Sequence, residues 1–425
     1  MRMSSSPLSG AVVLLLAVAC GLSVANVYYA QPLLDAMAET FAMDHATVGI
    51  IIALTQVGYG VGLLLLVPLG DLLNRRRLIV SQLLLSTLAV LMVGWSSSSF
   101  WLLAGMALTG LLAVVAQVLV ALAAHLASPE QRGHVVGLVT SGIVVGLLLA
   151  RSVSGAMADL AGWRSVYLLS AGLTLLMAIL LWRVLPSTEP PRASGTYGAL
   201  IRSVFSLFKE EKVLRDRAVL AMLIFAAGTV LWTPLVLPLS APPLSLSHTQ
   251  IGLFGLAGAT GALGAAHAGR LADQGLAQWT SGTALLLMLL SWVAIGFTQS
   301  SLWALLLGVI VFDLGLQAVH VTSQSLIYAV RPNAQSRLVA GYMLFYSVGS
   351  ALGSISATAM YAWGGWIGVC VLGAAINLLA LVYWLATLPP KPVSVLAAGH
   401  ALQHAVTTDQ PVEQGRRQVQ QHRQE

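Results

Sequence analysis

The chain has 425 residues, of which 57% are hydrophobic and only 8% are charged, and its mean hydropathy is +0.85. Soluble domains carry about 25% charged residues, so this chain has too little polar surface to cover a water-soluble particle of its size. The formal net charge of +6 does not indicate nucleic-acid binding, because no separate element suited to reading RNA or DNA is present.

The apolar residues are gathered in long runs. A transmembrane helix needs about 20 consecutive apolar residues, and windows of that length predict twelve spans. Helices are expected because the runs lack the alternation of a barrel strand and because open strands leave their backbone unsatisfied in lipid. The predicted spans cover residues 9–31, 47–69, 78–97, 100–126, 134–160, 163–186, 217–240, 249–271, 279–297, 301–328, 337–361 and 365–388.

The first apolar run is predicted to remain as a transmembrane span. A cleaved signal peptide would end near Ala19–Cys20, but the run continues through Asn26 and Tyr29 and is longer than a signal-peptide core. Cys20 and Cys370 lie inside the first and last spans, where they suggest neither a disulfide framework nor a metal site.

Basic residues predict the orientation. The loops assigned to the outer side hold Asp35, Glu39 and Asp44, with Arg164 as their one clear cation. The positive-inside rule then predicts that both termini are cytoplasmic. The basic residues assigned to the cytoplasmic side are Arg75, Arg76, Arg77, Arg132, Arg192, Arg202, Lys209, Lys212, Arg215, Arg217, Arg270, Arg331 and Arg337.

The longest hydrophilic interruption divides the spans six and six. It starts with the Pro-rich stretch 189–192, and apolar residues then recur at helical spacing between Tyr197 and Lys212, which predicts an amphipathic helix on the inner membrane surface. We therefore expect an N-terminal six-helix half at 1–186, a cytoplasmic linker at 187–216, a C-terminal half at 217–388 and a disordered tail at 389–425.

The two halves share motifs in the same order at a spacing of a little over 200 residues, which indicates an internal repeat. Two related halves in a membrane protein are typical of a transporter with its site between them. The matched pairs are Gly70–Arg77 with Gly269–Gly275, 129–133 with 332–337, Gly142 and Gly146 with Gly349 and Gly353, and Gly162–Trp163 with Gly365–Trp366.

These motifs resemble the major facilitator superfamily over nearly the whole chain. After the second span the family pattern is Gly-x-Leu-x-Asp-Arg-x-Gly-Arg-Arg, which Asp71, Arg75 and Arg76 match, and the second copy matches at Gly269, Leu271 and Asp273. Residues 26–34 are similar to the end of the first span in bacterial drug- and sugar-efflux members. The resemblance implies an all-α membrane protein with twelve helices in two pseudo-symmetric six-helix halves.

The fifth span resembles the motif of proton-coupled drug antiporters only in part. Gly133, Gly142 and Gly146 fall at the motif's spacing, but Leu147 replaces its proline and Ala150–Arg151 replace its Gly-Gly pair. Met106 stands nearest to the place of the arginine that these antiporters carry in the fourth span. The resemblance thus implies transport, and it implies proton-driven efflux through part of the motif.

Two charged residues are predicted near the middle of the bilayer. A charge at that depth costs at least about 2.5–3.5 kcal/mol on insertion scales, so it normally faces a cavity or a partner. Arg151 in span 5 and Asp313 in span 10 lie within ~3 Å in depth by helical rise. We expect them to couple protons to transport; the alternative is a permanent buried ion pair that only locks the bundle.

Other polar residues of the spans are predicted to contact a substrate. Gln317, His320 and Gln324 follow Asp313 at steps of four, three and four, which places all of them on one helical face. The resemblance makes span 10 a cavity helix; the alternative is a hydrogen-bonded seam between helices. The other candidates, Asn26, Tyr29 and Gln117, are equally compatible with helix packing.

The paired turns are predicted to be gating elements. Asp71 can accept hydrogen bonds from the start of a neighbouring helix, where the helix dipole favours an anion. By family analogy this partner is the start of span 11 near Arg337, and the contact would close the inner side. The other predicted gating residues are Arg75, Arg76, Arg132 and Asp273, while Gly142, Gly146, Gly349 and Gly353 are predicted to seat neighbouring helices.

The sequence therefore predicts a secondary active transporter, most simply a proton-coupled exporter of a small drug-like or sugar-like amphiphile that works by alternating access. The alternative is a facilitator or importer of a small polar solute on the same fold. An enzyme would need a metal cluster or a nucleophile beside a base, and a receptor would bind ligand without flux. We expect no cofactor and no metal. A monomer in the bacterial inner membrane, with lipid, protons and a small solute as its partners, is predicted.

Overall fold

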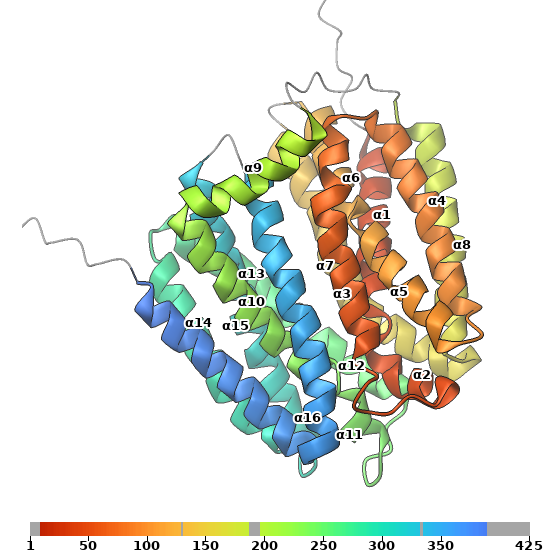
Figure 1. Ribbon diagram of the computed structural model, residues 1–425, viewed down its shortest axis with the longest axis vertical. Helices are drawn as coiled ribbons and strands as arrows, with labels where there is room; N and C mark the ends of the chain where they lie inside the picture. Colours follow the sequence, from red (N-terminus) through yellow and green to blue (C-terminus); the bar gives the residue numbers. More distant parts are fainter. Residues whose placement is uncertain (1–8, 129–130, 187–195, 332–334, 389–425) are drawn as a thin grey trace, which may run out of the picture. The chain divides into compact units, whose positions relative to one another are not determined.

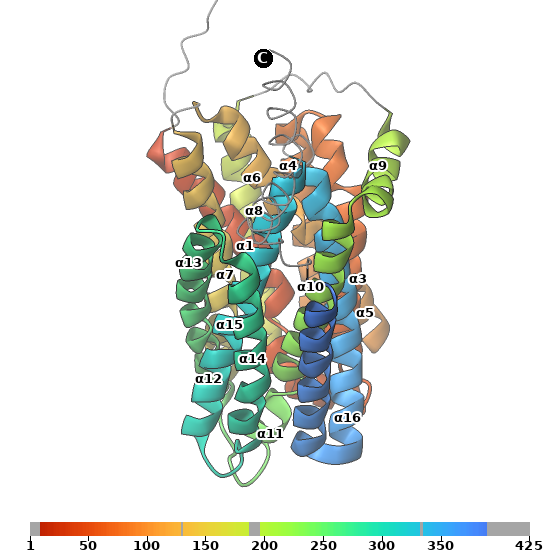
Figure 2. The same cartoon turned by 90° about the vertical axis from the view of Figure 1, so that its left-hand side faces the viewer.

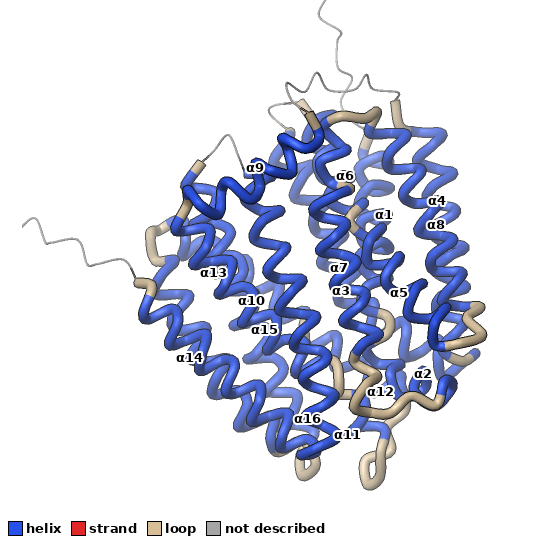
Figure 3. Tube along the Cα trace, in the orientation of Figure 1, coloured by secondary structure: helices blue, strands red, loops and turns tan. Residues whose placement is uncertain are grey.

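The computed structural model describes residues 9–128, 131–186, 196–331 and 335–388, so the predicted tail and the first part of the predicted linker lie outside the described residues. Within these ranges the regular structure is entirely helical (Figures 1 and 3). The first half holds α1 (Gly10–Tyr28), η1 (Gln31–Leu33), α2 (Leu34–Phe41), α3 (Ile50–Leu65), η2 (Val67–Asp71), α4 (Arg75–Gly94), α5 (Ser99–Ala113), α6 (Val115–Leu126), α7 (Arg132–Ala161) and α8 (Trp163–Val184). The remainder holds α9 (Tyr197–Glu210), α10 (Lys212–Trp232), α11 (Val236–Ser240), α12 (His248–Ala257), α13 (Ala259–Asp273), α14 (Ala277–Gly296), α15 (Leu302–Val330) and α16 (Gln335–Ala386).

Ten helical segments in the described residues are long and apolar enough to cross a membrane. Two features explain why the structure has ten such segments where the sequence predicts twelve spans. The window 249–271 is covered by α12 and α13, which follow one another through Gly258 (Figure 2). The last two windows form one segment, Arg337–Ala386, that bends at Gly365. Its φ of 60° lies in the left-handed region that glycine adopts without steric cost.

Most of the large helix–helix contacts are made within the first half or within the second half of the chain. In the first half α1 packs on α7, α3 on α5 and α4 on α8, whereas in the second half α13 and α14 both pack on α15. The principal contact between the halves is made by α7 with α12. Chain segments that are distant in sequence therefore meet where α7 faces α12.

Glycines allow two pairs of helices to approach closely. A Cβ atom on Gly146 of α7 would lie 2.2 Å from the backbone oxygen of Gly21 in α1, and one on Gly142 would lie 2.1 Å from that of Ala17. In the second half, a Cβ on Gly349 of α16 would lie 2.0 Å from the backbone oxygen of Met222 in α10. Gly353 approaches the same helix. The repeated glycines of the sequence thus mark equivalent helix contacts, α1 with α7 and α10 with α16.

The linker helix α9 lies across one end of the bundle (Figure 1). Val204 and Leu207 are buried while Phe205 is exposed, so the helix presents an apolar face to the protein. Tyr197 donates a hydrogen bond to the backbone oxygen of Leu65 in the first half. At the other end of α9, the adjacent residues Glu210 and Glu211 both form ion pairs with Arg331, which follows α15.

The two halves are joined at the end of the bundle opposite α9. There Gly49, which precedes α3, lies so close to α16 that a Cβ atom would fall 2.4 Å from the backbone oxygen of Ser354. Further contacts at this end include hydrogen bonds from Ser152 to the Gly252 oxygen, from Thr358 to the Ala46 oxygen and from Thr249 to the Asp159 carboxylate. This arrangement holds the bundle closed at that end.

Candidate functional site

A cavity lies between the halves and is lined from both of them. Its wall combines aromatic rings, three glutamine amides and two side chains of opposite charge. The lining residues are Tyr28, Gln31, Gln56, Leu147, Leu148, Arg151, Phe225, Gly228, Thr229, Trp232, Gly258, Asp313, Leu316, Gln317, Tyr346 and Ser350. A mostly apolar pocket with a few convergent polar groups is the usual form of a small-molecule site.

Arg151 extends from α7 into this cavity. The residue is only 7% exposed, and its Nε donates a hydrogen bond of 2.7 Å to Oε1 of Gln31 in η1. The guanidinium lies over the indole ring of Trp232 at 3.8 Å from the ring centroid. Cation–π contact of this kind stabilises a desolvated cation by about 2 kcal/mol. Arg151 is therefore held by groups that leave its positive charge without a directly bound anion.

Asp313 faces the same cavity from α15. It is 9% exposed, and its Oδ1 accepts a hydrogen bond of 3.3 Å from Nε1 of Trp232. The indole thus lies between the two charges, with its face against Arg151 and its N–H directed to Asp313. No direct ion pair between Arg151 and Asp313 is present among the described side chains. The structure brings the two predicted coupling residues into one cavity and connects them through Trp232.

Replacing Trp232 by Phe separates the two functions of this indole. Phenylalanine keeps an aromatic face for Arg151 but removes the donor to Asp313, and a hydrogen bond to a charged group contributes about 1.5–3 kcal/mol. We expect Trp232→Phe protein to fold and to transport with an altered pH profile. The measurement is initial transport rate against pH in liposomes. A profile that superposes on the wild-type profile would show that the N–H has no role in proton coupling.

The predicted polar face of span 10 divides into two parts. Asp313 and Gln317 line the cavity, whereas His320 has a partner of its own. Its Nδ1 lies 2.9 Å from the hydroxyl of Tyr342 in α16, and its ring meets Phe225 edge-on. Gln324 is half-buried about one turn further along α15. This polar face of α15 therefore contributes to the cavity and also to the contact between α15 and α16.

The candidates in the first half lie away from the cavity wall. Asn26 is buried and accepts a hydrogen bond of 2.5 Å from Ser170 of α8, and Tyr29 packs edge-on against Tyr167 of the same helix. Gln117 of α6 donates to the hydroxyl of Tyr59 at 3.4 Å. In this structure Asn26 and Tyr29 contact α8 and are not among the residues that line the cavity, and their substrate role stays a prediction.

The cavity residues that were not among the sequence candidates include Tyr28, Gln31, Gln56 and Tyr346. Tyr28 and Tyr346 share a hydrogen bond of 2.7 Å that joins α1 of the first half to α16 of the second. Gln31 and Gln56 could have been suspected as amides within apolar runs. The choice of Tyr28 over Tyr29 depends on the helical phase of α1, because neighbouring residues point about 100° apart.

The predicted gating residues make their described contacts within their own halves. Arg75 donates from Nε to the Gly70 oxygen at 3.0 Å, and Arg76 stacks on Trp182 of α8, to whose backbone oxygen it also donates. Asp71 ends η2. Arg132, Asp273 and Arg337 are exposed. The inner-gate contact stays a prediction.

The described residues contain no group of three or more His, Cys, Asp or Glu side chains that could hold a metal ion. The cavity instead offers a cation, an acid, amides and aromatic faces. Groups of these kinds are suited to hydrogen bonds and ring contacts with an organic molecule.

Comparisons with known proteins agree with this architecture. The Major Facilitator Superfamily model matches residues 14–274 and 218–419. The chain is 49% identical over 377 residues to the uncharacterized transporter YgaY of Escherichia coli O157:H7. This match covers 89% of this chain and 95% of the relative. It is 25% identical over 361 residues to a probable sugar efflux transporter of Helicobacter pylori, with coverage of 83% and 88%.

A solved structure has a similar fold. It is a bacterial homologue of the human lysosomal transporter Spinster in an inward-facing and unoccupied conformation, with a TM-score of 0.72 and 16% identity. The likeness covers 92% of this chain and 100% of that chain. From the family match, the close relative and the helical architecture, the chain belongs to the Major Facilitator Superfamily and is a membrane transporter rather than an enzyme.

Proposed function

We propose that this transporter exports a small amphiphilic, drug-like or sugar-like solute in exchange for protons, by alternating access. The observation that carries the proposal is the Arg151–Trp232–Asp313 arrangement in a cavity shared by both halves. A relative named for sugar efflux supports the direction and one of the solute classes. The aromatic rings suit an apolar face of the solute, and the glutamine amides suit its hydroxyl or amide groups.

In this mechanism the solute and the proton compete for one set of charges. Desolvation favours the uncharged form of a buried acid, whereas a neighbouring guanidinium favours the carboxylate. Protonation of Asp313 would weaken its attraction to Arg151 and its hydrogen bond from Trp232. The freed groups of the cavity would then rearrange as the halves rock, so that the solute leaves in one state and the proton in the other.

The proposal includes the finer topology expected from the sequence. Counting α12 with α13 as one span and dividing α16 at Gly365 gives twelve spans in two six-helix halves. The basic loops support a cytoplasmic location for α9 and both termini, in the bacterial inner membrane. The end closed by α7 and α12 is accordingly the outer end. The protein functions as a monomer, and the motif residues Asp71, Asp273, Arg132 and Arg337 close the inner side in the opposite state.

The test is transport by purified protein in liposomes that carry an imposed pH gradient. Labelled lactose represents the sugar-like class, ethidium represents the drug-like class, and a strain pair with and without the gene provides the wider screen. We expect one probe to accumulate against its gradient only while the pH gradient lasts. Equal exchange with and without the gradient would instead support a facilitator of a small polar solute, the alternative on this fold.

A further inference from the structure

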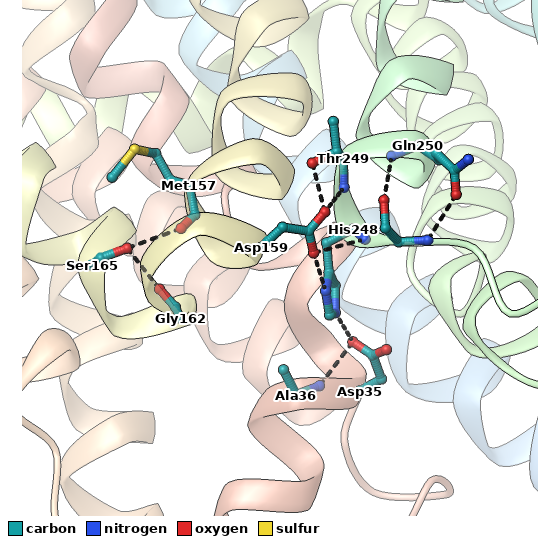
Figure 4. A network of polar contacts seen from close by, with 10 residues as sticks. Asp35, Ala36, Met157, Asp159, Gly162, Ser165, His248, Thr249 and Gln250 are labelled. Carbon is teal, nitrogen blue, oxygen red and sulfur yellow. Dashed lines mark hydrogen bonds and ion pairs between the residues drawn. The ribbon is translucent and has the colours of Figure 1, made fainter.

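A polar network joins α2 and α7 of the first half to the start of α12 in the second (Figure 4). These elements lie toward the end of the bundle opposite α9 (Figure 1). His248, the first residue of α12, lies between two carboxylates of the other half. Its Nε2 is 3.0 Å from Oδ1 of Asp35 in α2, and its Nδ1 is 3.1 Å from Oδ1 of Asp159 in α7. The three side chains are 21–28% exposed, so solvent reaches them while their contacts remain formed.

The geometry favours a proton on each ring nitrogen while both acids are ionised. A neutral imidazole has one N–H and one lone pair, so one of its nitrogens would face a carboxylate oxygen without a hydrogen between them. An imidazolium donates from both nitrogens and satisfies both acids. Since each donor–acceptor distance is that of a normal hydrogen bond, the closed arrangement is the one that the charged ring stabilises.

We propose that Asp35, His248 and Asp159 form a proton-binding latch on the outer face, which holds the halves together when His248 is protonated and loosens when it is neutral. The location of the latch on the outer face rests on the orientation in the proposed function. The latch is a second protonation site, distinct from Asp313, and it senses the external solution. Acid outside would keep the outer end closed and so slow each transport cycle.

A second contact between α7 and α12 does not depend on the His248 ring. Asp159 also caps the start of α12, because its carboxylate accepts from the backbone nitrogens of His248 and Thr249 at 3.2 and 2.8 Å. A carboxylate at a helix N-terminus is stabilised by the unpaired N–H groups and the helix dipole. The approach is close, since a Cβ on Gly155 would lie 2.1 Å from the His248 backbone oxygen. This cap persists when His248 loses its proton, so the ring adds a pH-sensitive part to a constant contact.

The latch and the cavity share their supporting elements. Asp35 is the second residue of α2 and follows Gln31, which accepts the hydrogen bond of Arg151, by four residues. Asp159 lies on α7 two turns, about 12 Å, beyond Arg151 itself. Separation of α12 from α7 and α2 therefore moves the Arg151–Gln31 pair relative to the second half, which includes Trp232 beneath the Arg151 guanidinium. Protonation of His248 would thus influence the positions of the cavity residues.

The other charged groups near α12 are directed elsewhere. Arg151 of α7 and Asp313 of α15 face the cavity, and α11 and η1 carry no titratable side chain. On α13, the exposed His267, Arg270 and Asp273 lie in the half of that helix away from α12, and Glu39 of α2 is exposed. The two carboxylates are thus the charged groups that contact the ring in the described structure.

The sign of the pH effect follows from these contacts. The hydrogen bond to Asp35, followed by the attraction of both acids, raises the pKa of His248 above its ordinary value of 6.5, while partial burial opposes this. When the halves separate, the ring loses both acids and its pKa returns toward the ordinary value. The extra stability of the closed state is therefore complete below the ordinary pKa and is lost as the pH rises through the raised pKa.

The experiment measures the outer distance directly, without a transported solute. Ser97 and Gln299 are exposed, lie in loops of opposite halves and do not belong to the latch. Spin labels are attached to Cys at these two positions after the buried Cys20 and Cys370 are replaced by Ala. Pulsed electron paramagnetic resonance in nanodiscs then gives the distance distribution at several pH values between about 5.5 and 8.5, the range over which histidine titrates.

We expect the longer, outer-open distance to increase severalfold in population from acid to alkaline pH. His248→Gln should remove most of this response, and Asp35→Asn, a second variant that keeps the Asp159 cap, should weaken it. His45→Gln is the matched control, because His45 is an exposed histidine of the outer end whose described contact is the ring of Tyr361. It should respond like the parent.

The same measurement in Asp313→Asn protein separates the latch from the proposed proton coupling. A response that survives in Asp313→Asn but not in His248→Gln supports the latch, whatever the transport assay shows. A response that survives in His248→Gln but not in Asp313→Asn assigns the pH effect to the cavity and overturns the latch. A parent distribution that does not change with pH overturns it as well.

Discussion

Asp313→Asn protein is expected to lose accumulation driven by a pH gradient while it keeps solute exchange without a gradient. Asparagine has nearly the shape of aspartate and can still accept the hydrogen bond from Trp232, but it cannot release a proton at Oδ1. The measurement compares uphill accumulation with counterflow in the same liposomes. Accumulation should fall to the level seen without a gradient, and the counterflow rate should be largely retained.

Two controls make this result specific. Asp313→Glu keeps a titratable acid at the position and should retain part of the coupling with a displaced pH profile. Asp44→Asn removes an exposed aspartate from a loop at the far end and should leave coupling unchanged. If Asp313→Asn protein accumulates solute as well as the wild type, Asp313 does not carry the coupling proton, and the Arg151–Trp232–Asp313 arrangement has a structural role only.

The second large effect is expected from Gly146→Leu in α7. The leucine Cβ would fall 2.2 Å from the backbone oxygen of Gly21, a contact that neither backbone can relieve by rotating a side chain. Overpacking of a core by extra methylenes costs about 1–3 kcal/mol when side chains can adjust, and more when they cannot. We expect a severe loss of folded, monodisperse protein by size-exclusion chromatography and a lower thermal midpoint.

The matched control for this variant is Gly137→Leu. Gly137 is exposed on the same helix, and a Cβ atom there would meet no other atom within 4 Å. Both variants make the same chemical change in α7, so they differ only in the neighbour they meet. Equal yields and midpoints for the two proteins would contradict close α1–α7 packing at Gly146. The equivalent site in the second half, Gly353, should behave like Gly146.

Much of the fold could be predicted because its cause is local. Apolar runs of about 20 residues are read along the chain, and they correctly predicted the all-helical class and the presence of membrane-spanning segments. The deviations occur where one residue changes the path of the backbone. Gly258 lies between α12 and α13, while Gly365 joins two expected spans in one bent segment, and neither effect is visible in hydropathy.

The candidate site was predicted less completely, because helical phase decides which residues meet. Arg151, Asp313 and Gln317 were found as rare polar residues in apolar runs, and the structure places them in one cavity. Asn26 satisfied the same criterion but is bonded to Ser170 instead. The latch residue His248 was missed, since its partners come from α2 and α7, some 90 to 210 residues earlier in the chain.

The sequence alone determined that this protein is a helical membrane transporter, since the energetic cost of placing polar groups in lipid restricts where charges and glycines can stand. Tertiary structure decided what those charges do. Arg151 and Asp313 are joined through the indole of Trp232, and Asp159 reaches the start of α12, because separate helices bring them together. Such contacts depend on the three-dimensional phase and tilt of packed helices, which local spacing along a chain does not specify.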